Sequence, residues 1–146
     1  MANLDIGAAD ALAKFAAEVE PLDPGAAQST YTHTFDLAPS CSPYLGAHLF
    51  DEESRDRARL MVGLRMTYRR AGIDLDDREL PDHISLVLDC APSFEEEEWC
   101  DLGRLILVPA LKKMEEILRP TTNPWRHLFG AARRLAETTF ADGGAL

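Results

Sequence analysis

The residues best suited to chemistry stand together in one short stretch, Leu80-Pro81-Asp82-His83, which leads directly into an apolar run. Proline fixes φ and donates no backbone hydrogen bond, so it suits the first turn of a helix. We expect Pro81 to open a helix with the Asp82 carboxylate in its first turn, where the helix dipole favours negative charge. The imidazole of His83 changes its charge near neutral pH. The stretch therefore predicts a sharp helix start that carries one acid and one imidazole.

The other reactive side chains form no recognisable catalytic or metal-binding pattern. The four histidines never pair at helical ligand spacing with one another or with a cysteine, and no Cys-x-x-Cys or His-Glu-x-x-His motif occurs. Cys41 is a conceivable nucleophile, but a free cysteine is more often a small buried hydrophobe. No nucleophile, base and oxyanion hole come together. The sequence therefore predicts no enzymatic activity, no metal and no cofactor, and it favours a binding protein.

Two other classes of function stay open at this point. Asp82 and His83 could act as acid and base in a small helical enzyme or ligand-binding regulator, although a third catalytic partner is lacking. A purely structural bundle is the third reading, in which the same two residues only cap a helix.

The net charge of −10 limits the partners of this chain. It argues against nucleic acid, because neutralisation of phosphates by Lys and Arg supplies most of that affinity. It also argues against an anionic membrane surface, whereas a basic partner would be attracted. The longest apolar run, residues 105–111, is too short to span a membrane, and the N-terminus lacks signal-peptide character. With three cysteines that form no paired framework, we expect a cytoplasmic protein without stable membrane insertion.

Apolar residues recur at helical spacing along nearly the whole chain. We expect an all-α, single-domain helical bundle with short connections over residues 1–140 and a frayed tail at 141–146. Ser54 and Gly72 mark the start and end of one helix, and Ser93 with Glu96 forms a capping-box pattern. Pro109 should kink or break the long helix that contains it. The helices are expected at about residues 3–20, 24–39, 43–49, 54–72, 81–92, 94–118 and 124–140.

Aromatic and acidic side chains gather on the segments around these helices in a way that suits a peptide groove. Aromatics beside carboxylates fit an apolar, basic peptide that binds as a helix, although plain core packing is the alternative for each aromatic residue. The candidate peptide-binding residues are Tyr31, Phe35, Asp36, Tyr44, Leu45, His48, Leu80, Pro81, Asp82 and His83.

An ordered set of motifs in this chain resembles one known family. Tyr31-Thr-His-Thr-Phe35-Asp36 is similar to the pattern Tyr-x-x-x-Phe-Asp, and Cys41-Ser-Pro-Tyr44-Leu45 is similar to the Cys-Ser-x-Tyr-Leu element that follows it. Glu79-Leu-Pro-Asp-His83 with Val87-Leu-Asp89 matches the strongest motif, and Asn123-Pro-Trp125 resembles the start of a closing helix. Together these motifs resemble the nitrate reductase assembly chaperones (the NarJ type), within the wider TorD/DmsD-like family of redox-enzyme maturation proteins.

This resemblance implies an all-α cytoplasmic protein that binds the basic N-terminal segment of a molybdoenzyme catalytic subunit. Such a chaperone holds the apoenzyme until the molybdenum cofactor is inserted, and then it leaves. The Asp-His pair of the family, here Asp82 with His83, takes part in recognition of the peptide. We expect a monomer, with a domain-swapped dimer as the alternative.

The chain also departs from the family pattern. The Leu-Leu-x-Tyr-Pro-like helix with which members usually begin is missing, and Cys90 stands where a phenylalanine is common. A longer C-terminal region, frequent in nitrate reductase chaperones, is not present. The client is therefore left open between nitrate reductase and a dimethyl sulfide or selenate-type enzyme.

Overall fold

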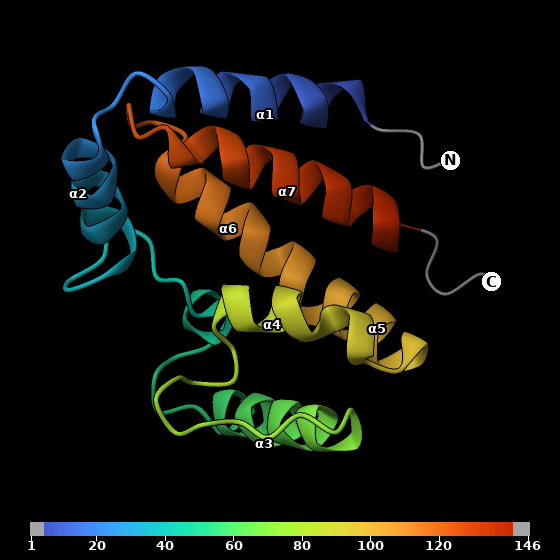
Figure 1. Cartoon of the computed structure of the whole chain (residues 1–146). Coiled ribbons are helices and arrows are strands. Elements are labelled where there is room, and N and C mark those ends of the chain that lie inside the picture. The colour runs from blue at the N-terminus through green and yellow to red at the C-terminus, as the bar shows by residue number, and fades with distance from the viewer. Residues whose placement is uncertain (1–4, 142–146) are drawn as a thin grey trace. The chain divides into compact units, whose positions relative to one another are not determined.

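The computed structural model describes residues 5–141, and these residues form helices and loops without a strand (Figure 1). The predicted all-α helical bundle is confirmed. The tail expected at 141–146 lies outside the described residues except for Ala141, and the domain boundaries stay a prediction. The described residues divide into two compact units by their contacts. The terminal unit is formed by the described part of Met1–Ser42 with Leu111–Ala141, and the central unit by Pro43–Ala110.

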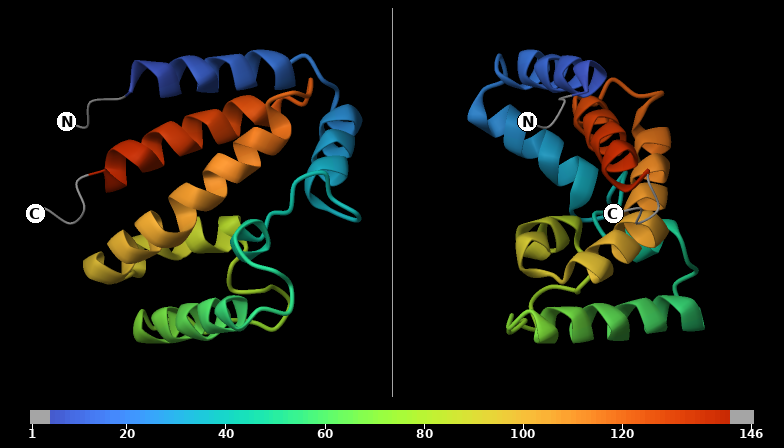
Figure 2. Two further views of the ribbon diagram at one scale, coloured as in Figure 1. Left: turned by 180° about the vertical axis from the view of Figure 1, so that it is seen from behind. Right: turned by 90° about the vertical axis from the view of Figure 1, so that its right-hand side faces the viewer.

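Local sequence signals explain how the helices of the terminal unit begin. In α1 (Ile6–Val19) the Asp5 carboxylate accepts a hydrogen bond from the Gly7 N–H. In α2 (Pro24–Phe35) Asp23 caps the start in the same way, with proline at the first position as expected. The unit also holds α7 (Trp125–Phe140) and most of α6 (Val108–Leu118). Helices α1 and α7 lie side by side (Figures 1 and 2).

Five aromatic rings form the core at one end of the terminal unit. The ring of Phe35 is the hub, with centroids 5.2 Å from Tyr31, 5.0 Å from Trp125 and 5.8 Å from Phe129. Phe15 of α1 completes the cluster, with its centroid 5.2 Å from that of Trp125. Since aromatic pairs at these separations add to the energy of burial, the cluster ties α2 to α1 and α7.

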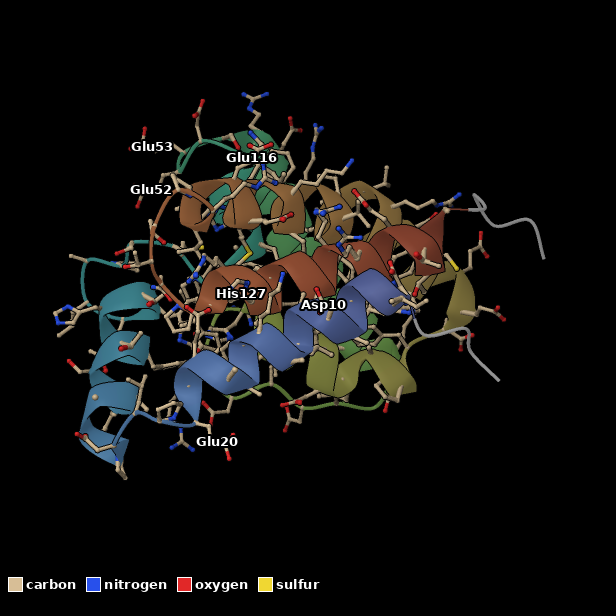
Figure 3. All side chains as sticks on the ribbon, turned by 90° about the horizontal axis from the view of Figure 1, so that it is seen from above. Asp10, Glu20, Glu52, Glu53, Glu116 and His127 are labelled. Carbon is tan, nitrogen blue, oxygen red and sulfur yellow. The ribbon has the colours of Figure 1, made fainter. Side chains whose placement is uncertain are left out.

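Ion pairs link the polar faces of the same helices. Glu18 of α1 pairs with Arg126 at 3.0 Å and with His127. Burial alone would raise the pKa of the Glu18 carboxyl, but Arg126 and His127 outweigh this effect and lower the pKa. Arg133 of α7 binds Glu115 of α6, and the Glu115 carboxylate raises the pKa of the guanidinium. A hollow of about 290 Å³ lies along these pairs, with Asp10 and His127 among its lining residues (Figure 3).

The central unit is built around α3 (Arg55–Arg70), which has Leu64 and Tyr68 buried on one face. Phe94 packs on Tyr68 at 5.4 Å between ring centroids, and the three residues form one hydrophobic cluster. As predicted, Ser54 caps the start of α3, and Gly72 follows its end with a φ of 76°. The other elements of the unit are η1 (Leu45–His48), α4 (Ile84–Cys90), η2 (Ala91–Ser93), α5 (Glu96–Leu102) and η3 (Gly103–Leu107).

The sequence predicts a kink or a break at Pro109, and the break does not occur, because the chain stays helical through this residue. The disturbance is instead a π-helical turn, η3, directly before the proline. In this turn the Val108 N–H donates to the Gly103 carbonyl, one residue further back than in an α-helix. A proline ring clashes with the carbonyl four residues earlier in a regular helix. The wider turn accommodates that ring and allows α6 to continue to Leu118.

Three predicted helix boundaries are wrong for local reasons. Helix α2 ends at Phe35 and not near residue 39, because Asp36 is already extended and Ala38, before a proline, has a φ of 53°. The expected helix at 43–49 is a short 3₁₀ turn that starts only at Leu45. Ser93 does not cap α5, because it belongs to η2 and the helix starts after Glu95.

Candidate functional site

The candidate site of the central unit is a corner where two segments distant in sequence, residues 43–48 and 79–84, are held together. The Leu45 N–H donates to the Asp82 carbonyl at 3.0 Å, and the Ile84 N–H donates to the Pro43 carbonyl at 2.9 Å. These two bonds make Tyr44 and His83 an isolated antiparallel β-bridge. The structure thus brings seven of the ten candidate residues into one corner, which is defined by Tyr44, Leu45, His48, Leu80, Pro81, Asp82 and His83.

Asp82 is the buried polar centre of this corner, with no exposed surface. Its Oδ2 accepts the Gly46 N–H at 2.8 Å, while its Oδ1 is buried without a hydrogen-bond partner in the described residues. Burial raises the pKa of the Asp82 carboxyl, and the Gly46 N–H and the charge of Arg57 oppose that shift in part. In this conformation Asp82 joins the two segments and does not present its carboxylate to solvent.

The predicted helix start at Pro81 is wrong, and so is the place of Asp82 in a first helical turn. Helix α4 begins at Ile84, and its N-cap is His83, whose Nδ1 accepts the Ser85 N–H at 3.2 Å. The helix starts late because the backbone before it is already engaged across the corner. The Pro81 carbonyl accepts the Tyr68 hydroxyl at 2.8 Å, and the next carbonyl accepts from Leu45.

Half-buried aromatic and polar side chains form the outer part of the corner. The Tyr44 ring meets the His83 imidazole edge-on, with 5.2 Å between centroids and 88° between planes. The Tyr44 hydroxyl also donates to the Glu79 carboxylate. Leu80 is 43% exposed, and His48 is half-buried at the end of η1. The accessible surface of the corner is therefore mixed aromatic, imidazole and aliphatic.

The other three candidate residues, Tyr31, Phe35 and Asp36, belong to the terminal unit. Phe35 is buried in the five-ring cluster, so core packing accounts for it. Tyr31 touches the same cluster but is 41% exposed, and Asp36 is exposed at the end of α2. Leu37, which the sequence did not single out, is 91% exposed beside them.

Several residues that shape the corner were not recognised from the sequence. Gly46 has no room for a side chain, because an added Cβ would lie 2.8 Å from Asp82 Oδ2 and 3.2 Å from a Leu60 methyl group. Tyr68 donates a hydrogen bond to the corner, and the acceptor role of Glu79 toward Tyr44 was not predicted, although Glu79 is part of the recognised motif. Their partners are between 13 and 36 residues away in the chain, so spacing within one segment gave no signal for them.

Reactive groups outside the corner have ordinary structural surroundings. Cys41 is buried, and burial raises the pKa of its thiol to about 11, so the thiol stays protonated at neutral pH. Within residues 5–141 no group of three or more His, Cys, Asp and Glu side chains is placed to hold a metal ion. No helix in the same range is long and apolar enough to cross a membrane.

The all-α fold and the Leu-Pro-Asp-His corner define a helical protein in which two segments distant in sequence are held together around the buried Asp82 carboxylate. The family model described as nitrate reductase delta subunit matches residues 2–131. The chain belongs to this family.

Curated relatives of the chain carry names from nitrate reductase assembly. It is 33% identical over 136 residues, 93% of this chain and 57% of the relative, to the "Nitrate reductase molybdenum cofactor assembly chaperone NarJ" of Escherichia coli K12. It is 32% identical over 115 residues, 79% of this chain and 49% of the relative, to the probable chaperone NarW of the same organism. It is 32% identical over 141 residues to the "Nitrate reductase-like protein NarX" of Mycobacterium tuberculosis, covering 94% of this chain and 21% of that protein. The chain thus spans about half the length of the chaperones it matches.

Proposed function

We propose that this protein is a cytoplasmic chaperone, not an enzyme, that binds the N-terminal segment of a molybdoenzyme catalytic subunit. It would hold the apoenzyme for insertion of the molybdenum cofactor, with respiratory nitrate reductase as the client. The observation that carries the proposal is family membership over residues 2–131, with 33% identity to a NarJ chaperone across 93% of the chain. A dimethyl sulfide or selenate-type enzyme is the alternative client.

The accessible part of the central corner suits an apolar and basic peptide. Leu80 offers exposed aliphatic surface, and Tyr44 and His83 offer two ring faces beside it. Glu79 adds a carboxylate to the same corner. We infer that the peptide contacts these side chains, and that Asp82 acts through the corner it holds in place. A direct ion pair from Asp82 to the peptide requires the corner to open, since that carboxylate has no exposed surface.

The terminal unit offers a second set of contacts for the same kind of peptide. Tyr31 and Leu37 supply exposed apolar surface, and Asp36 supplies a carboxylate between them in the chain. Buried Phe35 would hold the Tyr31 ring in position, since the centroids of the two rings are 5.2 Å apart. We propose Tyr31 and Asp36 as peptide contacts and Phe35 as their support.

Calorimetric titration of the full chain with synthetic N-terminal peptides of molybdoenzyme catalytic subunits tests the proposal. Binding of one peptide, stronger at low than at moderate salt, supports the chaperone function and names the client. A peptide of the same composition in scrambled order is the control. If no catalytic-subunit peptide binds better than its scrambled control, the proposal fails.

Two substitutions of His83 separate recognition from capping. His83→Asn keeps a side-chain acceptor that suits an N-cap, whereas His83→Ala removes both the cap and the ring. If His83 contacts the peptide, both variants bind weakly, although only the alanine variant loses thermal stability. If the asparagine variant binds like the parent protein, the imidazole is only a cap.

The reading as a small regulator or enzyme that uses Asp82 and His83 is less favoured, since the relatives are named as chaperones. It predicts that small-molecule binding or turnover is lost in Asp82→Asn. For the oligomeric state we expect a monomer, with a domain-swapped dimer as the alternative. Size-exclusion chromatography with light scattering measures the molar mass in solution and distinguishes the monomer from the dimer.

A further inference from the structure

Helix α3 concentrates positive charge in a very acidic chain. Its 16 residues contain six arginines and one aspartate, whereas the whole sequence has a net charge of −10. Arg59 pairs with Asp56 within the helix, and Arg70 pairs with Glu98. Arg55, Arg65 and Arg69 form no ion pair with any of the described residues, although carboxylates are the commonest charged groups of the chain. The outer face of α3 therefore carries positive charge that the fold leaves uncompensated.

Five side chains of α3 form one stripe along this outer face. They are Arg55, Arg59, Val62, Met66 and Arg69, and their spacing of four, three, four and three residues keeps them in line on a helix. All five are exposed; Val62 is 59% and Met66 is 49% exposed. The stripe has two apolar side chains at its centre and arginines at both ends. Such a pattern is typical of the contact seam between two helices.

The internal packing of the chain does not explain this stripe. Val62 and Met66 lie outside the hydrophobic cluster that α3 forms with the rest of the central unit. The helix dipole favours a cation at the C-terminal end, which accounts for Arg69 but opposes Arg55 in the first turn. Gly63 sits beside the stripe in the helix interior, and nothing lies within 4 Å of a Cβ placed there. A glycine with no structural need for its small size leaves room for the backbone of a partner.

Acidic residues bound the stripe at both ends and limit what can occupy it. Asp51, Glu52 and Glu53 precede α3, and Figure 3 shows Glu52 and Glu53 on the loop that leads into it. An acidic loop with Asp74, Asp76 and Asp77 follows the helix. The basic surface is thus about 24 Å long, the length of a 16-residue helix. A membrane or a nucleic acid would extend over the flanking carboxylates and be repelled, whereas a single helical segment would not.

We propose that the outer face of α3 binds an acidic amphipathic helix of a partner protein. Aliphatic side chains of that helix pack on Val62 and Met66, and its carboxylates pair with Arg55, Arg59 and Arg69. A second copy of this chain does not dock through the same stripe, because two such stripes would repel each other. The inference goes beyond the proposed function, since the client segment expected there is basic.

Fluorescence anisotropy with a labelled acidic peptide tests the proposal on the full chain. The probe is a helical peptide of about 16 residues, made of Glu and Ala with Leu at heptad spacing. We expect binding that weakens about tenfold in the double variant Arg59→Glu with Arg69→Glu, because two attractions become repulsions. We also expect weaker binding in Val62→Ser, which keeps every charge.

Matched controls make this experiment decisive. Arg78→Glu with Lys113→Glu changes the net charge equally at exposed sites outside α3 and should bind the probe almost like the parent chain. Circular dichroism verifies that each variant is folded. The proposal is overturned if the probe does not bind, if the control pair loses as much affinity, or if a probe with Lys in place of Glu binds equally well.

Two further probes address the other polyanions. Vesicles of phosphatidylserine and phosphatidylcholine report on membrane binding, and duplex DNA reports on nucleic acid. Preferential binding of either one through Arg59 and Arg69 would replace the proposal. The basic client peptide is titrated into the same variants, and its affinity should not fall. A failure of α3 binding is thereby distinguished from a failure of the proposed chaperone function.

Discussion

A single buried carboxylate holds the candidate corner together and makes it sensitive to very small changes. The Asp82 carboxylate accepts a hydrogen bond from the Gly46 N–H, and the Asp82 backbone carbonyl accepts one from the Leu45 N–H. This residue therefore holds the opposite segment at two points. Its second oxygen is buried without a described partner, which is costly for an ionised group. Burial accordingly raises the pKa of the residue that orders the corner.

Gly46→Ala should destabilise the protein by about 1–3 kcal/mol. The added Cβ would lie 2.8 Å from Asp82 Oδ2, and neither this short buried side chain nor the backbone donor opposite it can easily move away. Urea unfolding measures the change in the free energy of unfolding. A change within about 0.5 kcal/mol, typical of a surface substitution, would mean that the corner is loose.

Asp82→Asn should make the stability of the corner less dependent on pH. Because burial raises the pKa of Asp82 in the folded state, the unfolded chain loses this proton at a lower pH than the folded chain. The parent protein therefore loses stability as pH rises from about 4 to the raised pKa, by up to about 1.4 kcal/mol per pH unit. Asparagine carries no such proton, so the variant should gain relative to the parent across that range.

Unfolding free energies of the parent and Asp82→Asn proteins, measured at a series of pH values, give this difference directly. The difference in unfolding free energy should change with pH between the unfolded and the folded pKa of Asp82, and it should be constant at higher pH. Arg57→Gln is the companion variant, because loss of its charge should extend the range to higher pH. A difference that does not vary with pH would show that Asp82 titrates as it does in the unfolded chain.

At the scale of the elements, the sequence predicted those features that depend on near neighbours. Asp23 with Pro24 before α2, Ser54 before α3 and Gly72 after it were all found as expected, because each cap acts within about three residues. The all-α class followed from apolar spacing in the same local way.

The features that sequence reasoning missed depend on residues far apart in the chain. Pro81 does not start α4, because its carbonyl is held by Tyr68 and the backbone after it is bound to the opposite segment. The burial of Asp82 follows from the same long-range bonds. Phe35 belongs to a ring cluster with residues about 90 positions later, which local periodicity cannot reveal. The composition of the corner was thus predictable from its motif, but its geometry was not.

Gly63→Ala should stabilise α3 by about 0.5–1 kcal/mol. This glycine lies inside the helix, its φ is not positive, and an added Cβ would meet nothing within 4 Å. Thermal unfolding is measured for both variants, and the change in stability should be positive for Gly63→Ala and negative for Gly46→Ala. A loss of stability in Gly63→Ala would mean that packing within the chain itself constrains this position.

At the scale of the whole molecule, the charge of the chain creates a long-range field that would attract a basic peptide. With α3 set aside, the remaining residues carry a larger negative charge than the net value of −10, because that helix holds six arginines and one aspartate. Such a field increases the rate at which a basic peptide meets the protein, and salt screens it. Dissociation is governed by close contacts, which salt affects much less.

The association rate of a basic client peptide should therefore fall about tenfold or more between 0.01 M and 0.5 M salt, while the dissociation rate stays nearly constant. Stopped-flow fluorescence with a labelled peptide measures both rates. Removal of positive charge in Arg59→Glu with Arg69→Glu makes the field more negative, so this variant should bind the basic peptide slightly faster at low salt. If the salt dependence appears in dissociation instead, short-range ion pairs at the site hold the peptide and the overall field of the protein has little part in its capture.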